Sequence, residues 1–232
     1  MEDKIICIKN LHYSYPDGTK ALSDINLEIQ CGESLGIIGS NGAGKSTLLL
    51  HFNGILQGTG NISVAGERLT DKNLSKIRSI VGLVFQDPDS QLSMPTVFDD
   101  VGFGPINMDM PQEEVEKSVH KALSDVDMLS SIKSSSHHLS IGEKKRIAIA
   151  TVLSMNPQIL VMDEPSSNLD PRHRRELIKL INKLEMTKII ATHDLELIGN
   201  TCSRIILMEE GKIIAGGLCP EFLAEVADFY QS

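Results

Sequence analysis

The sequence has no tryptophan, few other aromatic residues, and fewer basic than acidic residues. Six Phe and three Tyr among 232 residues leave little surface on which nucleic-acid bases could stack. Lys and Arg number 22 against 31 Asp and Glu, which gives a net charge of −9. Because proteins that bind the phosphate backbone carry a basic surface, these absences argue against nucleic acid as a partner.

Long apolar runs and clustered cysteines are also missing. No stretch approaches the roughly 18 apolar residues of a membrane-spanning helix, and the N-terminus MEDKIICIKN lacks the apolar run of a signal peptide. We therefore expect neither direct membrane insertion nor export. The four cysteines contain no CxxC pair, which favours buried or incidental thiols in a reducing compartment over a zinc site or disulfides. They are Cys7, Cys31, Cys202 and Cys219.

The residues that are present predict one α/β unit with a helical insert. Apolar residues make up 41% of the chain, enough for a sizeable core. Predicted β segments cover residues 5–15, 21–29, 34–39, 61–69, 79–86, 158–162, 187–192, 204–208 and 212–217, the last two as a hairpin. Predicted helices cover 45–56, a segment from Pro111 onward, 172–184 and 193–200. Between about 87 and 156 the pattern is helical, which predicts an insert in the α/β unit.

A phosphate-binding loop lies between the strand at 34–39 and the following helix. The run GSNGAGKS matches GxxxxGK[ST] without a mismatch and has the strand–loop–helix context that the motif requires. Backbone N–H groups of such a loop wrap phosphates, Lys45 reaches the β and γ oxygens, and Ser46 can hold Mg²⁺. The predicted ATP-binding residues here are Gly39, Ser40, Asn41, Gly42, Ala43, Gly44, Lys45, Ser46 and Thr47.

Two acids follow the apolar run 159–162. A buried parallel strand would place Asp163 and Glu164 at its carboxyl end, where α/β proteins bind ligands. Such a pair alone is often a solvated turn. Beside a phosphate-binding loop, we expect Asp163 to bind Mg²⁺ and Glu164 to orient or deprotonate the attacking water.

A second helix N-terminus suited to an anion lies at LSIGE, residues 139–143. Ser140 and Glu143 have the spacing of a capping box, which is a purely structural interpretation. A capped helix still presents its dipole and N–H groups to a ligand. Both interpretations stay open on the residues alone.

Taken in order, these motifs resemble the nucleotide-binding subunit of an ABC transporter. The set comprises GSNGAGKST, Gln86 at a strand end, LSIGE, ILVMDE, SSNLD at 166–170 and His193 after TKIIAT. The resemblance covers about residues 5–223. It implies an α/β fold with a P-loop NTPase (RecA-like) core at about 1–86 and 157–232, an N-terminal antiparallel β subdomain, and an inserted α-helical subdomain at about 87–156.

The resemblance also implies roles for single residues. Tyr15 would stack on adenine, with Tyr13 as the weaker candidate. Gln86 would touch Mg²⁺ or the water, and His193 would contact the γ-phosphate. Ser140 and Gly142 would face ATP held by a second subunit, and Asp170 is expected among the nucleotide-binding residues.

Three residues depart from the usual motifs, and one of them, Glu143 in place of the glutamine of LSGGQ, is a familiar variant among the importers named below. Ile141 replaces the first glycine of LSGGQ, where a side chain could crowd the partner's nucleotide and slow turnover. Asn168 replaces a small residue, and it suits a left-handed backbone conformation.

The segment from Phe85 to Met108 resembles the ATPases of energy-coupling-factor importers. The segment at 137–172, which begins HHLSIGEKKR, and the run ATHDLELI resemble the cobalt and nickel branch of that group. This implies an ATPase that works with a second ATPase subunit, a homodimer being favoured over a heterodimer, and with two membrane proteins, one for coupling and one for substrate capture. It would lie at the cytoplasmic face of the cell membrane as a peripheral protein. His137 and His138 are not expected to bind the transported metal. The alternatives are another ABC importer, for a vitamin or other solute, and a soluble ABC ATPase.

Overall fold

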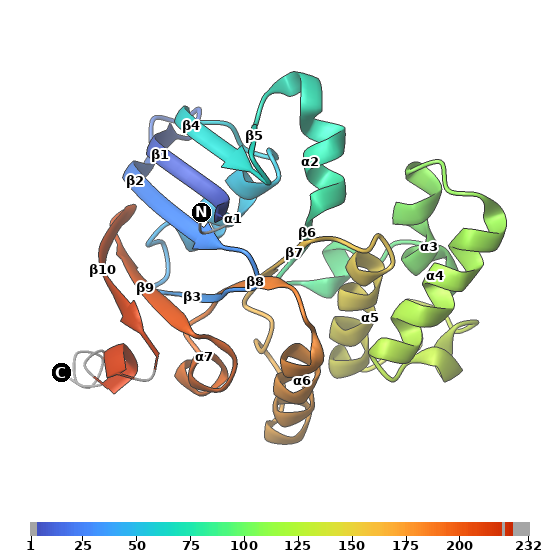
Figure 1. Cartoon of the computed structure of the whole chain (residues 1–232). Helices are drawn as coiled ribbons and strands as arrows, with labels where there is room; N and C mark the ends of the chain where they lie inside the picture. Colours follow the sequence, from blue (N-terminus) through green and yellow to red (C-terminus); the bar gives the residue numbers. More distant parts are fainter. Residues whose placement is uncertain (1–3, 220, 225–232) are drawn as a thin grey trace.

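A computed structural model describes residues 4–219 and 221–224 (Figure 1). Four strands within residues 4–68 form an antiparallel sheet in the order β2-β1-β4-β5. Its strands are β1 (Lys4–Ser14), β2 (Lys20–Gln30), β4 (Thr59–Val64) and β5 (Glu67–Arg68). In β2 buried and exposed residues alternate, as expected for a strand that packs one face on the core.

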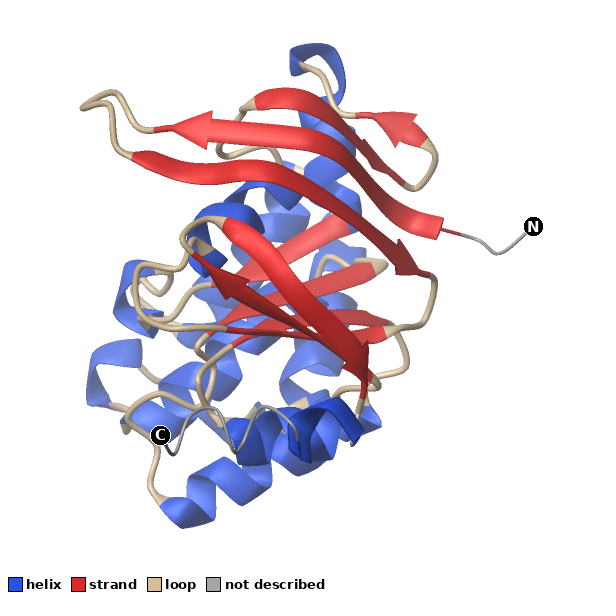
Figure 2. Ribbon diagram, turned by 90° about the vertical axis from the view of Figure 1, so that its left-hand side faces the viewer, coloured by secondary structure: helices blue, strands red, loops and turns tan. Residues whose placement is uncertain are grey.

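A six-stranded sheet lies beneath this one (Figure 2), in the order β10-β9-β3-β8-β7-β6. Its strands are β3 (Ser34–Ile38), β6 (Val81–Val84), β7 (Ile159–Asp163), β8 (Thr187–Ala191), β9 (Arg204–Glu209) and β10 (Lys212–Leu218). All neighbours pair in parallel except β9 and β10, which form an antiparallel hairpin. The continuous apolar runs of β6, β7 and β8 are buried because both faces of the sheet are covered.

Besides a short helical turn at residues 221–224, seven α-helices are described. They are α1 (Lys45–Phe52), α2 (Leu74–Ile80), α3 (Val97–Asn107), α4 (Gln112–Asp125), α5 (Ile141–Leu153), α6 (Pro171–Lys183) and α7 (Leu195–Thr201). Helix α1 packs between the two sheets, whereas α5, α6 and α7 cover the other face of the large sheet. Helices α3 and α4 project to one side and contact the rest mainly through α5 (Figure 1).

Several predicted elements are confirmed and others need correction. The antiparallel β subdomain, the P-loop strand and helix, and the β9–β10 hairpin all form, with Glu210 and Gly211 at positive φ in its turn. The strand predicted at 79–86 begins only at Val81, because residues 79 and 80 end α2. Helix α2 was not predicted, and α3 was predicted only as part of the helical pattern at about 87–156. Helix α2 buries only Ile77, and α3 carries Gly102, Gly104 and Pro105, so neither shows a clear helical period.

Further expectations concern the cysteines, Asn168, membrane-spanning helices and the division of the chain. All four cysteines are free, and Asn168 has φ 60°, the left-handed conformation expected for it. No helix within residues 4–219 and 221–224 is long and apolar enough to span a membrane. The division into core and insert stays a prediction, and its ends at 1–3 and 225–232 lie outside the described residues.

Candidate functional site

The loop between β3 and α1 forms a tight concave turn that only small residues permit. A Cβ on Gly39 would lie 2.3 Å from the Met208 carbonyl oxygen, and Gly39 has φ 153°. Gly44 has φ 100° and begins α1 as its N-cap. Lys45 Nζ donates to the carbonyls of Gly39 and Ser40, at 2.7 and 3.0 Å. The loop therefore holds a buried ammonium inside the curve that its backbone makes.

A pocket of about 440 Å³ opens at this loop, which is a size typical of small-molecule sites. It brings together residues from the N-terminal sheet, the loop and the carboxyl ends of the large sheet's strands. Its lining residues are Tyr15, Thr19, Lys20, Ala21, Asn41, Gly42, Gly44, Lys45, Ser46, Thr47, Gln86, Glu164 and His193. Most of the predicted site residues thus meet in one place, although they are spread over the sequence.

Asp163 lies at the end of β7 with one carboxylate oxygen, Oδ1, buried and without a hydrogen-bond partner. Burial raises the pKa of Asp163, and a hydrogen bond from the Ser46 side chain acts in the opposite direction. An unpaired buried carboxylate oxygen is costly, and a hard cation would satisfy it, since Mg²⁺ prefers carboxylate and hydroxyl oxygens. Asp163 and Ser46 therefore fit a Mg²⁺ ion.

Glu164 is held in a strained position at the wall of the pocket. Its φ is 43°, in the left-handed region that costs a non-glycine residue about 1–2 kcal/mol. Its Oε2 accepts a hydrogen bond from Thr192 Oγ1 at 2.8 Å and lies 2.9 Å from His193 Nδ1. These contacts aim the carboxylate, and they fix the His193 ring beside it.

Tyr15, and not Tyr13, lines the pocket. The Tyr15 hydroxyl lies 2.9 Å from Thr47 Oγ1, and its ring packs edge-on against Tyr13. Tyr13 in turn packs edge-on against the buried ring of His51. The location agrees with the choice of Tyr15 for adenine stacking, which stays a prediction.

Six predicted nucleotide-binding residues do not line this pocket. Gly39, Ser40 and Ala43 belong to the P-loop itself, whereas Ser140, Gly142 and Asp170 lie elsewhere in the chain. Ser140 and Glu143 form the predicted capping box at the start of α5. Asp170 caps α6 and holds His173, whose ring lies so close to Gly142 that a Cβ there would come within 2.8 Å of it. Within one chain, Ser140, Gly142 and Asp170 lie where the N-termini of α5 and α6 meet, so a role of these three residues in binding ATP requires a second chain.

Sequence reasoning missed two residues that contact the site, Thr192 and Lys145. Lys145 is buried, and its Nζ donates to Gln86, Glu164 and Ser167. Burial lowers the pKa of Lys145 to about 8, and the negative charge of Glu164 is the largest opposing influence. The sequence could have indicated that Lys145 is buried, because it lies on the apolar face of α5 with Ala148, Ile149 and Val152.

A separate groove lies between α2, α3 and α5, and its lining includes Phe85, Met94, Phe103 and Met108. The mixture of acids, prolines and apolar residues in the segment 86–97 predicts a docking surface for the cytoplasmic helices of a membrane partner, with Leu92 as a contact residue. Ser90, Gln91, Ser93 and Met94 of this segment line the groove, but Leu92 is 3% exposed and belongs to the core, so its choice as a contact residue is wrong. It is buried because the turn Pro88–Ser90 directs it inward beneath α5.

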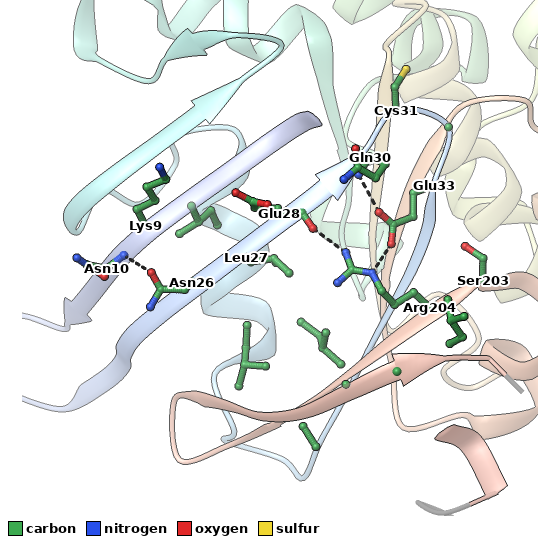
Figure 3. Close-up of a pocket in the computed structure, with 18 residues that line it drawn as sticks. Lys9, Asn10, Asn26, Leu27, Glu28, Gln30, Cys31, Glu33, Ser203 and Arg204 are labelled. Carbon is green, nitrogen blue, oxygen red and sulfur yellow. Dashed lines mark hydrogen bonds and ion pairs between the residues drawn. The ribbon is translucent and has the colours of Figure 1, made fainter. Parts of the chain in front are cut away.

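The largest cleft contains none of the predicted site residues. It lies between β2 and the β9–β10 hairpin (Figure 3), and two of its charged groups, Arg204 and Glu33, pair with each other. Arg204 donates to Glu33 and to the Glu28 carbonyl, and Glu33 accepts from the Gln30 N–H. This cleft is therefore a weaker candidate than the P-loop pocket, despite its size.

No group of three or more His, Cys, Asp or Glu side chains suited to a metal ion occurs among the described residues.

Comparison with known proteins agrees with this geometry. A family model described as "ABC transporter" matches residues 22–167. A putative ABC transporter ATP-binding protein of Gloeobacter violaceus is 48% identical over 95% of this chain and 91% of its own length. The energy-coupling factor transporter ATP-binding protein EcfA of Methanococcus maripaludis is 47% identical over 95% of this chain and 82% of its own.

Solved structures give the same result. The cbiO1 protein of Clostridium perfringens, described as part of the ABC transporter complex cbiONQ, is 41% identical, with a TM-score of 0.88 over 99% of this chain and 94% of its own. The ATP-binding cassette MJ0796, solved as a dimer with ADP and Pi, is 28% identical, with a TM-score of 0.83 over 92% and 98% of the two chains. This chain belongs to the ABC transporter family, as one of its ATP-binding cassettes, and is an ATPase.

Proposed function

We propose that this chain is the ATPase subunit of an energy-coupling-factor importer that takes up cobalt or nickel ions. The observation that carries the proposal is the similarity to cbiO1, which extends over 99% of the chain at 41% identity. The similarity to EcfA supports the same class of importer. The alternative is the ATPase of another ABC importer, because the Gloeobacter relative has no named solute.

The pocket supports a specific assignment of roles in ATP hydrolysis. Lys45 and the loop N–H groups bind the phosphate oxygens, and Tyr15 stacks on adenine. Ser46, Asp163 and Gln86 would hold Mg²⁺, which would neutralise charge on the phosphates. Glu164 accepts the proton of the attacking water, and its bond from Thr192 keeps the carboxylate aimed at that position.

His193 completes the site from the β8 end. Its Nδ1 lies 2.9 Å from Glu164 Oε2 while most of its side chain stays exposed at the pocket, which supports a contact with the γ-phosphate of bound ATP. The loop of one chain leaves that phosphate uncovered on one side, and Ser140 and Gly142 of a second copy would close it.

We further propose the setting in which this ATPase works. It acts in pairs, two copies of this chain being favoured, at the cytoplasmic face of the cell membrane as a peripheral protein. A transmembrane coupling protein binds it in the groove between α2, α3 and α5, and a substrate-capture membrane protein completes the importer. The exposed apolar side chains of Phe103 and Met108 support this choice of groove.

The test is ion uptake by cells that lack their own copy of this protein. We expect wild type to restore uptake of radioactive cobalt or nickel and Glu164→Gln to fail, because Glu164→Gln lowers ATP hydrolysis by about 10²-fold or more while ATP still binds. Glu185→Gln, an exposed glutamate outside the pocket, is the matched control and should restore uptake.

Two results would redirect the proposal. Vitamin uptake that depends on Glu164 while metal uptake does not would favour the other importer class. Glu164→Gln hydrolysis within threefold of wild type would remove Glu164 from the catalytic role.

A further inference from the structure

Lys145 is a buried cation whose three partners belong to two segments around the pocket, Gln86 after β6 and Glu164 and Ser167 after β7. It is 4% exposed. Its Nζ donates to the Gln86 carbonyl at 3.1 Å, to the Glu164 carbonyl at 3.3 Å and to Ser167 Oγ at 3.0 Å. An ammonium has three donors, so Lys145 uses all of them to join the segments that follow β6 and β7.

One of these bonds acts on the strained backbone of Glu164. A positive φ at a non-glycine residue persists only where the surroundings hold it. Here the Glu164 N–H donates to the Ala191 carbonyl at 2.8 Å, while the Glu164 carbonyl accepts from Lys145. Of the described residues that contact Glu164, Lys145 is the one that lies on helix α5. It therefore helps to set the direction in which the Glu164 side chain leaves the backbone.

Helix α5 carries Lys145 close to its own N-terminus. Ser140 and Lys145 are five residues apart, about 7.5 Å along a rigid helix. The neighbouring Lys144 forms an ion pair with Asp89 at 2.6 Å, which ties the same turn of α5 to the segment after Gln86. A displacement of the N-terminus of α5 would thus move the Lys145 ammonium with it.

We propose that Lys145 is a positioning residue that holds the backbone of Gln86 and Glu164 in a fixed position relative to the N-terminus of α5. The rate of ATP hydrolysis therefore depends on the position of this helix. Lys145 touches neither ATP nor the attacking water in this role. The inference rests on the proposed function, since it takes Glu164 as the residue that accepts the proton.

The test compares Lys145→Met with Lys188→Met in the full chain. Lys188 is a second buried lysine, with Nζ donating to the carbonyls of Ile181 and Leu184 at 3.2 and 2.9 Å, outside the pocket. We expect kcat for ATP to fall on the order of 10- to 100-fold in Lys145→Met with KM unchanged. Lys188→Met should lose thermal stability and keep kcat.

Hydrogen exchange supplies a readout that does not need turnover. The Ser167 N–H donates to the Glu164 carbonyl, so its exchange should accelerate in Lys145→Met and stay unchanged in Lys188→Met. If Lys145→Met does not fold, Lys145→Gln, which keeps a shorter donor, should show the same changes to a smaller degree. Wild-type kcat together with wild-type exchange at Ser167 would overturn the proposal, as would an equal fall in kcat in Lys188→Met. If Glu164→Gln also hydrolyses ATP normally, the proposed function fails instead, and the exchange result still decides the role of Lys145.

Discussion

At the scale of single residues, the two neighbouring acids of the pocket have opposite environments. Asp163 is buried with an oxygen that has no partner, whereas Glu164 is tied to Thr192 and His193. Adjacent carboxylates on a strand point to opposite faces, and the bend at Glu164 turns its side chain toward the pocket. The neighbouring residues Asp163 and Glu164 are therefore suited to different roles, Asp163 as a cation ligand and Glu164 as a base.

We expect Asp163→Asn to stabilise the protein without Mg²⁺. Because the pKa of Asp163 is raised in the folded state, its ionised form destabilises the fold at neutral pH, and this penalty disappears as the pH falls through that raised pKa. If the free energy of unfolding rises by about 1 kcal/mol, the melting temperature of the variant at pH 7 in a chelator should lie about 2–4 °C above that of wild type. The increase in melting temperature should be smaller at acidic pH.

The same melting experiment with Mg-ATP provides the control. Wild type should gain stability from the ligand, and Asp163→Asn should gain little. A lower melting temperature for the variant in chelator would mean that the buried charge is favourable as it stands.

At the scale of elements, α3 is unusual because it exposes large apolar side chains. Phe103 is 53% exposed and Ile106 is 54% exposed, although Val97 and Val101 on the same helix are buried. Its packing against α4 and α5 is therefore one-sided. An apolar face beside a groove is typical of a surface that binds another protein.

We expect Phe103→Asp to weaken co-purification of the membrane coupling protein, because a charge placed in an apolar contact is costly to desolvate. ATP binding should not change, since Phe103 lies outside the P-loop pocket. The matched control is Leu129→Asp, which alters a side chain that is 41% exposed and does not line the groove. Normal assembly of Phe103→Asp, or equal loss in both variants, would exclude the groove as the docking site.

At the scale of the whole molecule, the chain carries two separated helix N-termini suited to phosphate. The P-loop end of α1 lies in the pocket, and the LSIGE end of α5 lies against α6 instead. Ile141 is 38% exposed at that end, so its side chain does not pack in the chain's own core. Only a head-to-tail pair of chains could bring the LSIGE end of one to the P-loop of the other.

A mixing experiment tests this pairing. Lys45→Ala inactivates a chain's own P-loop, and Ser140→Arg inactivates its LSIGE end, so each variant alone should be inactive. Mixed dimers hold one site with both defects and one site with neither. We therefore expect the mixture to recover up to about a quarter of wild-type hydrolysis, since half of random dimers are mixed. No recovery, with dimers shown to exchange, would contradict the trans role of Ser140.

The local motifs could be predicted from the sequence because each is contiguous. Glycines that permit the P-loop turn, a lysine and hydroxyl after it, and two acids ending an apolar run carry their chemistry in neighbouring residues. The capping box and the positive φ of Asn168 were likewise predictable, because they depend on backbone preferences over a few residues.

Contacts between distant segments were decided by the tertiary structure alone. Lys145 lies 59 residues from Gln86 and 22 from Ser167, and no local pattern indicates that these groups meet. Leu92 stands in a polar segment that suggests exposure, yet the packing of α5 buries it. The periodicity of apolar residues indicates which face of a helix or strand is apolar. Which residues are buried and which side chains pair depends on the other element that covers each face.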